Sequence, residues 1–494
     1  MLRSVAISAL LAVSLGLCAC SDSNDGTLAV AFIDDEANLF ADGIRLSQGG
    51  QHVRAAIKSG LVALDQNGDV VPALADRWNV TAEGSIFVFR LRDGTWPDGR
   101  ELTSESVRTA LQQAIRDLRG TSLGIDLSPI DDVRAMAGRV IEIRLASPLP
   151  DLLQLLAQPE LALTRGEGDT GNMLLEREEG AALLSMKPPP ERGLPEEEGW
   201  QRYTRSIGLQ ALDAQAAVSV FDEGEVDVVL GGRLASLPLA DTGPLSRGTV
   251  RLDPAIGLFG LHVLRDRGIL ARSGTREALA MAIDRSELAA IFNVGGWVPT
   301  TRVVAPGLSE DAGLVGERWA DLGIDGRRSL AASRIAAWRS SDGGDDPALG
   351  LTLSMSIGNE PGHALLFDEL SRQWASIGVA LVRAGEGEAA DLALVDRVAR
   401  YGSPIWFLNQ FNCLLERGIC SEEADVLAAQ VLDEVEPAIR ARLIGEAEAA
   451  LTNENVYIPF GSPLRWSLVR GGVEGFSGNR WGFHPLSEFA VIPR

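Results

Sequence analysis

The sequence predicts an α/β protein with more than one domain. Segments with the alternating pattern of strands and segments with the 3.6-residue pattern of helices follow one another along the chain, which is typical of folds that layer helices on sheets. The chain has 494 residues, more than a single hydrophobic core usually supports, so we expect two or three domains. A hydrophobic content of 46% is enough to fill their cores.

The first clear element is a hairpin. Two apolar stretches, residues 61–64 and 70–74, flank an Asn-Gly-Asp turn at 67–69. Asn-Gly supplies the positive φ angles that a tight hairpin turn needs. We therefore predict two paired strands on either side of Gly68.

A strand and a helix come next. In residues 85–91, isoleucine and valine alternate with phenylalanine and leucine, which predicts a strand. Asp-Gly at 98–99 predicts a turn, and Thr103 is placed to cap a helix that runs to about residue 115.

Irregular stretches separate the later elements. Residues 166–172 are rich in glycine, and residues 187–199 form a proline-rich, acidic loop. Residues 364–376 carry leucines and a tryptophan at helical spacing, Gly378 ends that helix, and residues 379–382 resume a strand. This helix and strand are one αβ unit of the second half of the chain.

The N-terminus has the features of a lipoprotein signal. Arg3 precedes a 13-residue apolar stretch, and Leu-Cys-Ala-Cys at 17–20 ends it with small residues before a cysteine. Thirteen residues are too few to cross about 30 Å of hydrocarbon. We expect residues 1–19 to be removed, Cys20 to carry lipid and residues 20–26 to form a polar tether. An uncleaved short anchor is the alternative.

Two cysteines remain in the body of the protein, Cys413 and Cys420. In an exported chain, two isolated cysteines this close predict one disulfide, which the loop-entropy model values at roughly 2 to 3 kcal/mol. A metal site is disfavoured because the spacing is not CxxC and the four histidines are scattered singly. We predict no metal site.

Composition and motifs argue against nucleic-acid binding and catalysis. The net charge is −23 at pH 7, and such a surface repels a phosphate backbone. Residues 166–171 spell GxGxxG, but no helical cap follows and acidic residues lie where a pyrophosphate would sit. No GxxxxGK, HExxH or GxSxG motif is present. We predict no cofactor and no catalytic residue.

Four stretches together resemble the peptide/nickel (oligopeptide/dipeptide-binding) class of extracytoplasmic solute-binding proteins, which serve ABC importers. Residues 60–107 (GLVALDQNGDVVPALADRWNVTAEGSIFVFRLRDGTWPDGRELTSESV) follow the order of that family's signature. The resemblance returns at 221–230 (FDEGEVDVVL), at 276–285 (REALAMAIDR) and at 447–475. These matches occur in the family's order and are spread along most of residues 28–494.

The resemblance implies an α/β periplasmic-binding-protein clamshell with two lobes, mixed β-sheets and an enlarged first lobe. Lobe I is expected over residues 27–253 and again over 464–494, where the chain returns, and lobe II over 254–463. In such a protein the ligand binds between the lobes and shifts the population from open to closed. The closed form then docks on a membrane permease.

The resemblance also gives a candidate ligand site in residues 390–411. Where the family's oligopeptide binders have an aspartate for the peptide α-ammonium and a tryptophan that walls the pocket, this sequence has Arg400 and Arg397, with Tyr401 in register. Arginine repels an ammonium but offers a planar fork to a carboxylate or phosphate. Three possibilities stay open: an anion-accepting pocket, a solvated face or pairing with Asp396 and nearby glutamates, and a site that has lost binding.

The function implied is capture of a peptide-like or other small solute without bond chemistry, with anionic and amine-blocked solutes among the candidates. The expected partners are that ligand, an ABC permease in the inner membrane, and the membrane through lipid on Cys20, with no nucleic acid. We expect the protein in the periplasm, with inner or outer membrane open. An envelope lipoprotein with a structural or chaperone-like role is the alternative, and an envelope hydrolase comes third.

Overall fold

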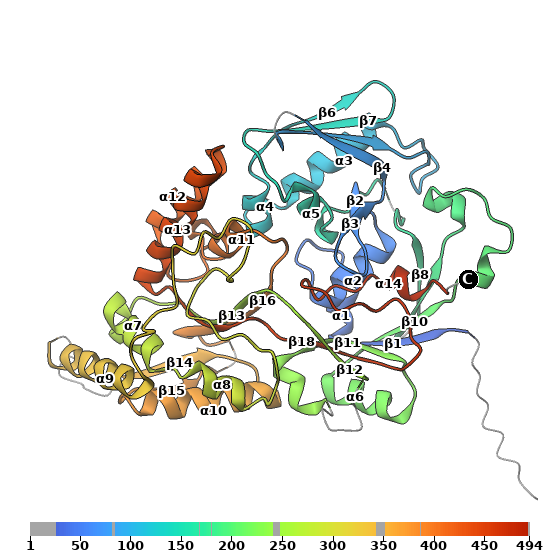
Figure 1. The fold of residues 1–494 in the computed structure, drawn as a ribbon. Helices are drawn as coiled ribbons and strands as arrows, with labels where there is room; N and C mark the ends of the chain where they lie inside the picture. Colours follow the sequence, from blue (N-terminus) through green and yellow to red (C-terminus); the bar gives the residue numbers. More distant parts are fainter. Residues whose placement is uncertain are drawn as a thin grey trace, which may run out of the picture.

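The computed structural model describes residues 26–81, 84–166, 168–178, 180–240, 248–341, 351–385 and 387–492. The predicted signal segment 1–19 and Cys20 lie outside the described residues. Two large mixed sheets, each with helices packed on it, form the base of the molecule, and a smaller antiparallel sheet lies above one of them (Figure 1). The predicted α/β class with mixed sheets agrees with this arrangement.

The largest sheet has seven strands, in the order β12, β18, β11, β1, β10, β9, β8. Its centre is parallel, because β1 pairs in parallel with both β10 and β11, and the outer pairs are antiparallel. Most of β1 is buried, as expected for a central strand with an unbroken apolar sequence. The strands are β1 (Leu28–Ile33), β8 (Met173–Glu178), β9 (Ala181–Met186), β10 (Ile207–Leu212), β11 (Val228–Arg233), β12 (Val250–Asp253) and β18 (Arg465–Val469).

The residues before 150 form a hairpin and the four-stranded sheet. The hairpin is confirmed: Gly68 has φ +81° between β2 and β3. The predicted helix is also present, with the Thr103 side chain accepting a bond from the Ser106 N–H. The elements are β2 (Val62–Leu64), β3 (Val70–Pro72), β4 (Ala75–Thr81), β5 (Ile86–Leu91), β6 (Ile130–Met136), β7 (Val140–Leu145) and α3 (Ser104–Asp117).

The other helices on this side of the molecule are mostly short. Helices α2 and α14 pack together near the seven-stranded sheet, and α6 packs on β1 and β11. The remaining ones are α1 (Glu36–Leu39), α2 (Gln48–Ile57), α4 (Ser122–Asp126), α5 (Leu152–Leu156), α6 (Ala214–Glu223) and α14 (Leu486–Phe489).

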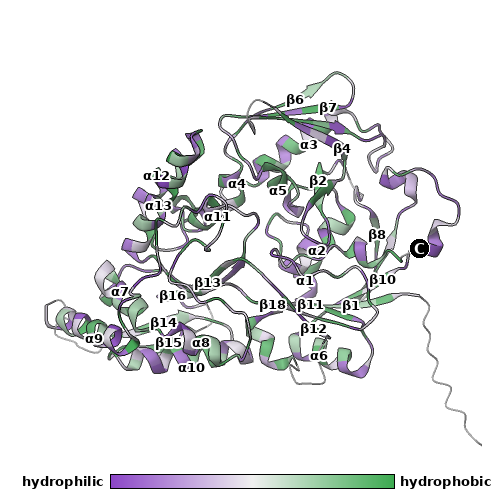
Figure 2. Ribbon diagram, in the orientation of Figure 1, coloured by the Kyte–Doolittle hydropathy of each residue, from purple (hydrophilic) through white to green (hydrophobic). Residues whose placement is uncertain are grey.

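The second large sheet has five strands, in the order β15, β14, β16, β13, β17. They are β13 (Gly257–Val263), β14 (Thr352–Ser356), β15 (Ala380–Arg383), β16 (Leu392–Val398) and β17 (Tyr457–Gly461). The helices with them are α7 (Ser273–Ala282), α8 (Arg285–Ala290), α9 (Ile324–Ser341), α10 (Pro361–Ala375), α11 (Pro404–Asn409), α12 (Glu422–Asp433) and α13 (Pro437–Glu454). Helices α9 and α10 each carry hydrophobic and hydrophilic residues (Figure 2), as helices with one buried face do.

The chain crosses between the two large sheets twice, from β12 to β13 and from β17 to β18. We call the body with the seven-stranded and four-stranded sheets lobe I (residues up to 253 and from 464) and the body with the five-stranded sheet lobe II (254–463). The crossings adjoin the lobe boundaries that the sequence suggested. As limits of units that move against each other, these boundaries remain a prediction.

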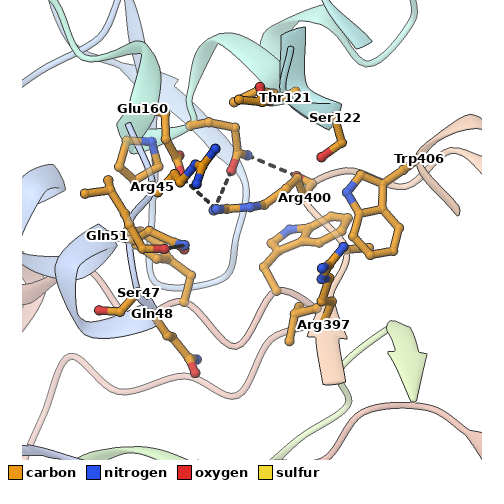
Figure 3. A pocket seen from close by; sticks show the side chains of 18 of the residues that line it. Arg45, Ser47, Gln48, Gln51, Thr121, Ser122, Glu160, Arg397, Arg400 and Trp406 are labelled. Carbon is orange, nitrogen blue, oxygen red and sulfur yellow. Dashed lines mark hydrogen bonds and ion pairs between the residues drawn. The ribbon is translucent and has the colours of Figure 1, made fainter. Parts of the chain in front are cut away.

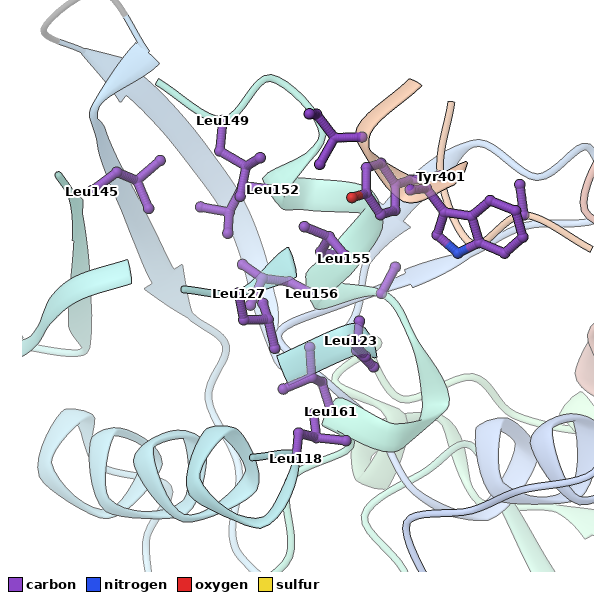
Figure 4. Close-up of a cluster of buried hydrophobic side chains, with 14 of the residues drawn as sticks. Leu118, Leu123, Leu127, Leu145, Leu149, Leu152, Leu155, Leu156, Leu161 and Tyr401 are labelled. Atoms are coloured by element: carbon purple, nitrogen blue, oxygen red, sulfur yellow. The ribbon is translucent and has the colours of Figure 1, made fainter. Parts of the chain in front are cut away.

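A buried apolar cluster extends through both lobes. It joins the leucines of α4 and α5 in lobe I to Tyr401 and Trp406 in lobe II, and Figure 4 shows the Tyr401 ring beside those leucines. The lobes are therefore in close contact in this structure. Within the part of the chain that the structure describes, no helix is both long and apolar enough to cross a membrane.

Candidate functional site

A cavity of about 740 Å³ lies between the lobes. Lobe I contributes the loop before α2, the start of that helix, α4 and residues 158–160. Lobe II contributes the end of β16 and the segments around Trp406 and Arg417. Its volume is in the range of sites that enclose a small organic molecule.

Arg400 reaches from lobe II to lobe I and is held there by two side chains. Its Nη2 donates to Glu160 Oε1 at 2.6 Å, and its Nη1 donates to Gln158 Oε1 at 3.2 Å. Gln158 Nε2 donates in return to the Arg400 carbonyl oxygen at 3.0 Å. Figure 3 shows these bonds at the wall of the cavity. Arg400 lines the cavity, but its guanidinium already has a carboxylate partner.

The sequence allowed a pairing of Arg400 with Asp396 or a nearby glutamate, and the structure gives a different partner. Asp396 Oδ1 instead accepts from Arg465 Nη1 at 2.7 Å, and Arg465 is the first residue of β18. Glu160, the partner of Arg400, lies in a 3-10 helix, Pro159–Leu161. Two ion pairs therefore join the lobes at this cavity.

Arg397, on β16, also lines the cavity and has a different environment. Its Nη1 donates to the neutral amide of Gln410 at 3.2 Å. Burial, and secondly the charge of Arg417, lowers the Arg397 pKa to about 10. By accessible area Arg397 is exposed. The two observations agree because the surface that it exposes faces the cavity between the lobes rather than bulk solvent.

Tyr401 does not line this cavity. Its side chain is 1% exposed and packs in the leucine cluster at the contact between the lobes (Figure 4). Burial, followed by the nearby Asp126 carboxylate, raises the pKa of its hydroxyl well above the usual value. The structure thus places Tyr401 in the interface that closes the cavity.

Asp126 is a third polar contact between the lobes. Its Oδ1 accepts from Asn409 Nδ2 at 2.7 Å, across from α4 to α11. Burial raises the pKa of Asp126 from 3.8 to about 7. Its carboxyl is therefore partly protonated near neutral pH.

The structure joins Cys413 and Cys420 in a disulfide, with the two Cα atoms 5.3 Å apart. The loop that it closes carries Leu415 and Arg417, and both line the cavity. Burial, and secondly the charge of Arg45, lowers the pKa of Arg417. The disulfide therefore restrains a wall of the cavity, a role that spacing alone did not reveal.

The lobe I wall is polar and neutral where α2 begins. Ser47, Gln48, Gln51 and His52 line it. The His484 N–H donates to His52 Nε2 at 2.9 Å, so His52 Nδ1 donates to the Gln48 carbonyl oxygen at 2.6 Å. Burial lowers the His52 pKa to about 3, so this imidazole is neutral.

The lining of the cavity is chemically mixed. It combines arginines, amides and hydroxyl groups with the rings of Trp406, Trp481 and Phe483. Among the described residues, no group of three or more His, Cys, Asp or Glu side chains is arranged to hold a metal ion. The GxGxxG stretch leads into strand β8 and not into a helix, which removes the geometry of a dinucleotide site.

Comparison with known proteins identifies the fold. The structure is similar to Haemophilus influenzae OppA in complex with RPPGFSPFR (TM-score 0.78, 16% identity, 94% of this chain and 99% of that one). It is also similar to the Escherichia coli murein tripeptide binding protein MppA (TM-score 0.77, 18% identity, 95% and 98%). The fold is thus the two-lobed clamshell of periplasmic binding proteins, as predicted.

Comparison of sequences finds related proteins. Residues 69–177 match the model for "Bacterial extracellular solute-binding proteins, family 5 Middle". The chain is 22% identical over 447 residues to the dipeptide-binding protein DppE of Bacillus subtilis (strain 168), covering 82% of this chain and 80% of that protein. These matches support the resemblance, found in the sequence, to family 5 extracytoplasmic solute-binding proteins of the peptide/nickel class.

We expect the Arg400–Glu160 pair to be energetically coupled. Both side chains are largely buried, whereas Arg442 and Glu446, also 2.6 Å apart, are about half exposed. A double-mutant cycle of Arg400→Met and Glu160→Gln, measured by urea unfolding, should give a coupling of about 1–3 kcal/mol. The control cycle at Arg442 and Glu446 should give less than about 0.5 kcal/mol. Additive effects at Arg400 and Glu160 would mean that the pair does not form in solution.

Asp126 should make stability fall as pH rises. Between pH 4 and 7 the folded protein keeps a proton on Asp126 that the unfolded chain has lost, so each step up in pH favours unfolding. Asp126→Asn removes this contribution, and the stability difference between pH 5 and pH 8 should shrink by roughly 2–3 kcal/mol. Asp76→Asn, at an exposed position, is the control. Parallel pH profiles for wild type and Asp126→Asn would contradict the assignment.

Proposed function

We propose that the protein is the solute-binding component of an ABC importer. It captures a peptide-like or other small solute between its lobes and delivers it to a permease in the inner membrane. The observation that carries the proposal is the cavity of about 740 Å³, whose walls come from both lobes. Because the walls belong to different lobes, a solute that touches both favours the closed form over the open one.

Binding without bond chemistry fits the residues of the cavity. Among the described residues that line the cavity, His52 is the only histidine, and it is buried and neutral, with both ring nitrogens engaged. None of these lining residues is a lysine or a cysteine. We therefore propose no enzymatic activity, no cofactor and no nucleic-acid partner.

The names of the relatives favour a peptide as the ligand. The charged groups that line the cavity restrict which peptides it can bind. The resemblance placed a family aspartate for the peptide α-ammonium at position 400, where this chain has arginine. Glu160 is the acid that contacts Arg400, and its Oε1 is already bonded to Arg400 at 2.6 Å. We infer that a captured peptide is not anchored through a free α-amine at this place.

The contacts between the lobes favour a second candidate, a structural or chaperone-like envelope protein on the same fold. Arg400–Glu160, Arg465–Asp396 and the buried Tyr401 all hold the lobes together. Such contacts between the lobes would also suit a protein whose role depends on a fixed surface. The two candidates differ in whether a solute stabilises the protein.

Native mass spectrometry and thermal unfolding test the proposal together. Protein purified from its host should carry a small molecule, and adding this molecule back to stripped protein at 100 times its Kd should stabilise the fold by about 2.7 kcal/mol. Trp406→Ala, which removes a ring from the cavity wall, should weaken this effect. Val426→Ala, at an exposed position on α12, should not. An empty cavity in purified protein, with no response to peptides or acids, would favour the structural role.

We also propose that lipid on Cys20 holds the protein at the envelope membrane, on the periplasmic side. The support is the Leu-Cys-Ala-Cys sequence at 17–20 and the polar residues after it. Lipoprotein processing supplies the two or more acyl chains that stable anchoring requires.

Cys20→Ser should abolish labelling with a fatty-acid probe and release the protein from washed membranes. Cys18→Ser, two residues earlier in the segment expected to be removed, is the matched control and should leave labelling intact. Labelling of the Cys20→Ser protein would exclude Cys20 as the lipid site.

A further inference from the structure

The charge inside the cavity is opposite in sign to that of the protein. The whole chain has a formal net charge of −23. Yet six arginines and three carboxylates line the cavity: Arg45, Arg233, Arg397, Arg400, Arg417 and Arg465, with Asp126, Glu160 and Asp396. An interior this rich in guanidinium groups attracts anions and repels cations.

Two of these arginines form ion pairs with carboxylates, and a third lies near a carboxylate without an ion pair to it in the described part of the chain. Arg400 pairs with Glu160 and Arg465 pairs with Asp396. Arg233 lies close enough to Glu360 that its charge helps to lower the pKa of that carboxyl. Arg45, Arg397 and Arg417 are left, and none of them forms an ion pair with a carboxylate in the described part of the chain.

These three arginines act on one another. The positive charge of Arg417 disfavours the charged form of Arg397. In the same way, the positive charge of Arg45 disfavours the charged form of Arg417. They come from three separate segments: the loop before α2 in lobe I, strand β16, and the loop closed by the Cys413–Cys420 disulfide. A repulsive cluster assembled from both lobes lowers stability, and such clusters are kept where a ligand supplies the missing charge.

We propose that Arg45, Arg397 and Arg417 form the subsite for the acidic groups of the captured solute, an organic molecule with two or more negative charges. The inference rests on the proposed solute-binding function. A guanidinium pairs with a carboxylate or phosphate through a planar fork of donors. A single negative charge leaves most of this cluster uncompensated, and the rings of Trp406 and Trp481, which line the same cavity, give an organic body a surface to pack on.

The test uses the mature protein with Arg397→Gln and Arg417→Gln, and Arg339→Gln as the matched control. Arg339 is an exposed arginine at the end of α9 that has no ion pair within the described residues. Citrate is the organic polyanion probe, inorganic phosphate the anion without an organic body, trialanine the zwitterionic probe and maltose the neutral one. Calorimetry and thermal unfolding are measured for each protein and each probe.

We expect citrate to bind, phosphate to bind more weakly, and both variants to lose at least tenfold in citrate affinity while Arg339→Gln does not change. Without any probe, Arg397→Gln should unfold at a higher temperature than wild type, because it removes a repelled charge. An arginine that only packs or forms structural bonds would instead lower the unfolding temperature when replaced. A lower citrate affinity together with a higher unfolding temperature in the same variant therefore identifies a binding residue.

Unchanged citrate affinity in both variants, or a lower unfolding temperature for Arg397→Gln, would overturn the subsite. If trialanine or maltose binds and citrate does not, the subsite is wrong and the solute-binding function stands. If none of the four probes binds and the protein from its host carries no solute, both proposals fail.

Discussion

Contact between residues 396–411 of lobe II and the helices of lobe I turns two separate surfaces into one cavity. Three kinds of contact act within this short segment: the Arg400–Glu160 ion pair, the Asn409–Asp126 hydrogen bond and the burial of the Tyr401 ring among leucines. Burial of apolar side chains favours contact between the lobes but does not specify how they are oriented. The polar pairs fix the relative position in which the lobes meet. Since the cavity lies between the two lobes, its shape depends on these contacts.

The same segment places charge at the wall of the cavity. Arg397 and Arg400 are three residues apart, but β16 ends between them. Arg397 therefore stays on the strand and faces the cavity, whereas Arg400 lies in the following loop and reaches Glu160. Neighbours in sequence thus have different chemical roles. One guanidinium holds the lobes together, and the other remains without a carboxylate in the described protein.

Local signals in the sequence predicted local structure well. Asn-Gly at 67–68 gave the hairpin, and Thr103 gave the start of α3, because both depend on residues a few positions apart. Strand β4 was missed because it lies at the edge of its sheet, where all but Ala75 and Trp78 are exposed and no apolar alternation is needed. Glu160 was missed as the partner of Arg400 because 240 residues separate them. Arg417 had one usable signal, its position between two cysteines that form a disulfide.

Replacing an acid by arginine at position 400 does not by itself reverse the preference of the cavity. The Arg400–Glu160 pair is nearly neutral as a unit, so it contributes little field to a solute and acts mainly through the contact that it makes. What sets the polarity is the balance among the other groups. Asp126 is partly protonated near pH 7 and Asp396 is engaged with Arg465, so neither offsets Arg397 and Arg417. The sign of the charge in the cavity therefore depends on which carboxylates are already paired where the lobes meet. This pairing is a property of the tertiary structure and cannot be read from any single position in the sequence.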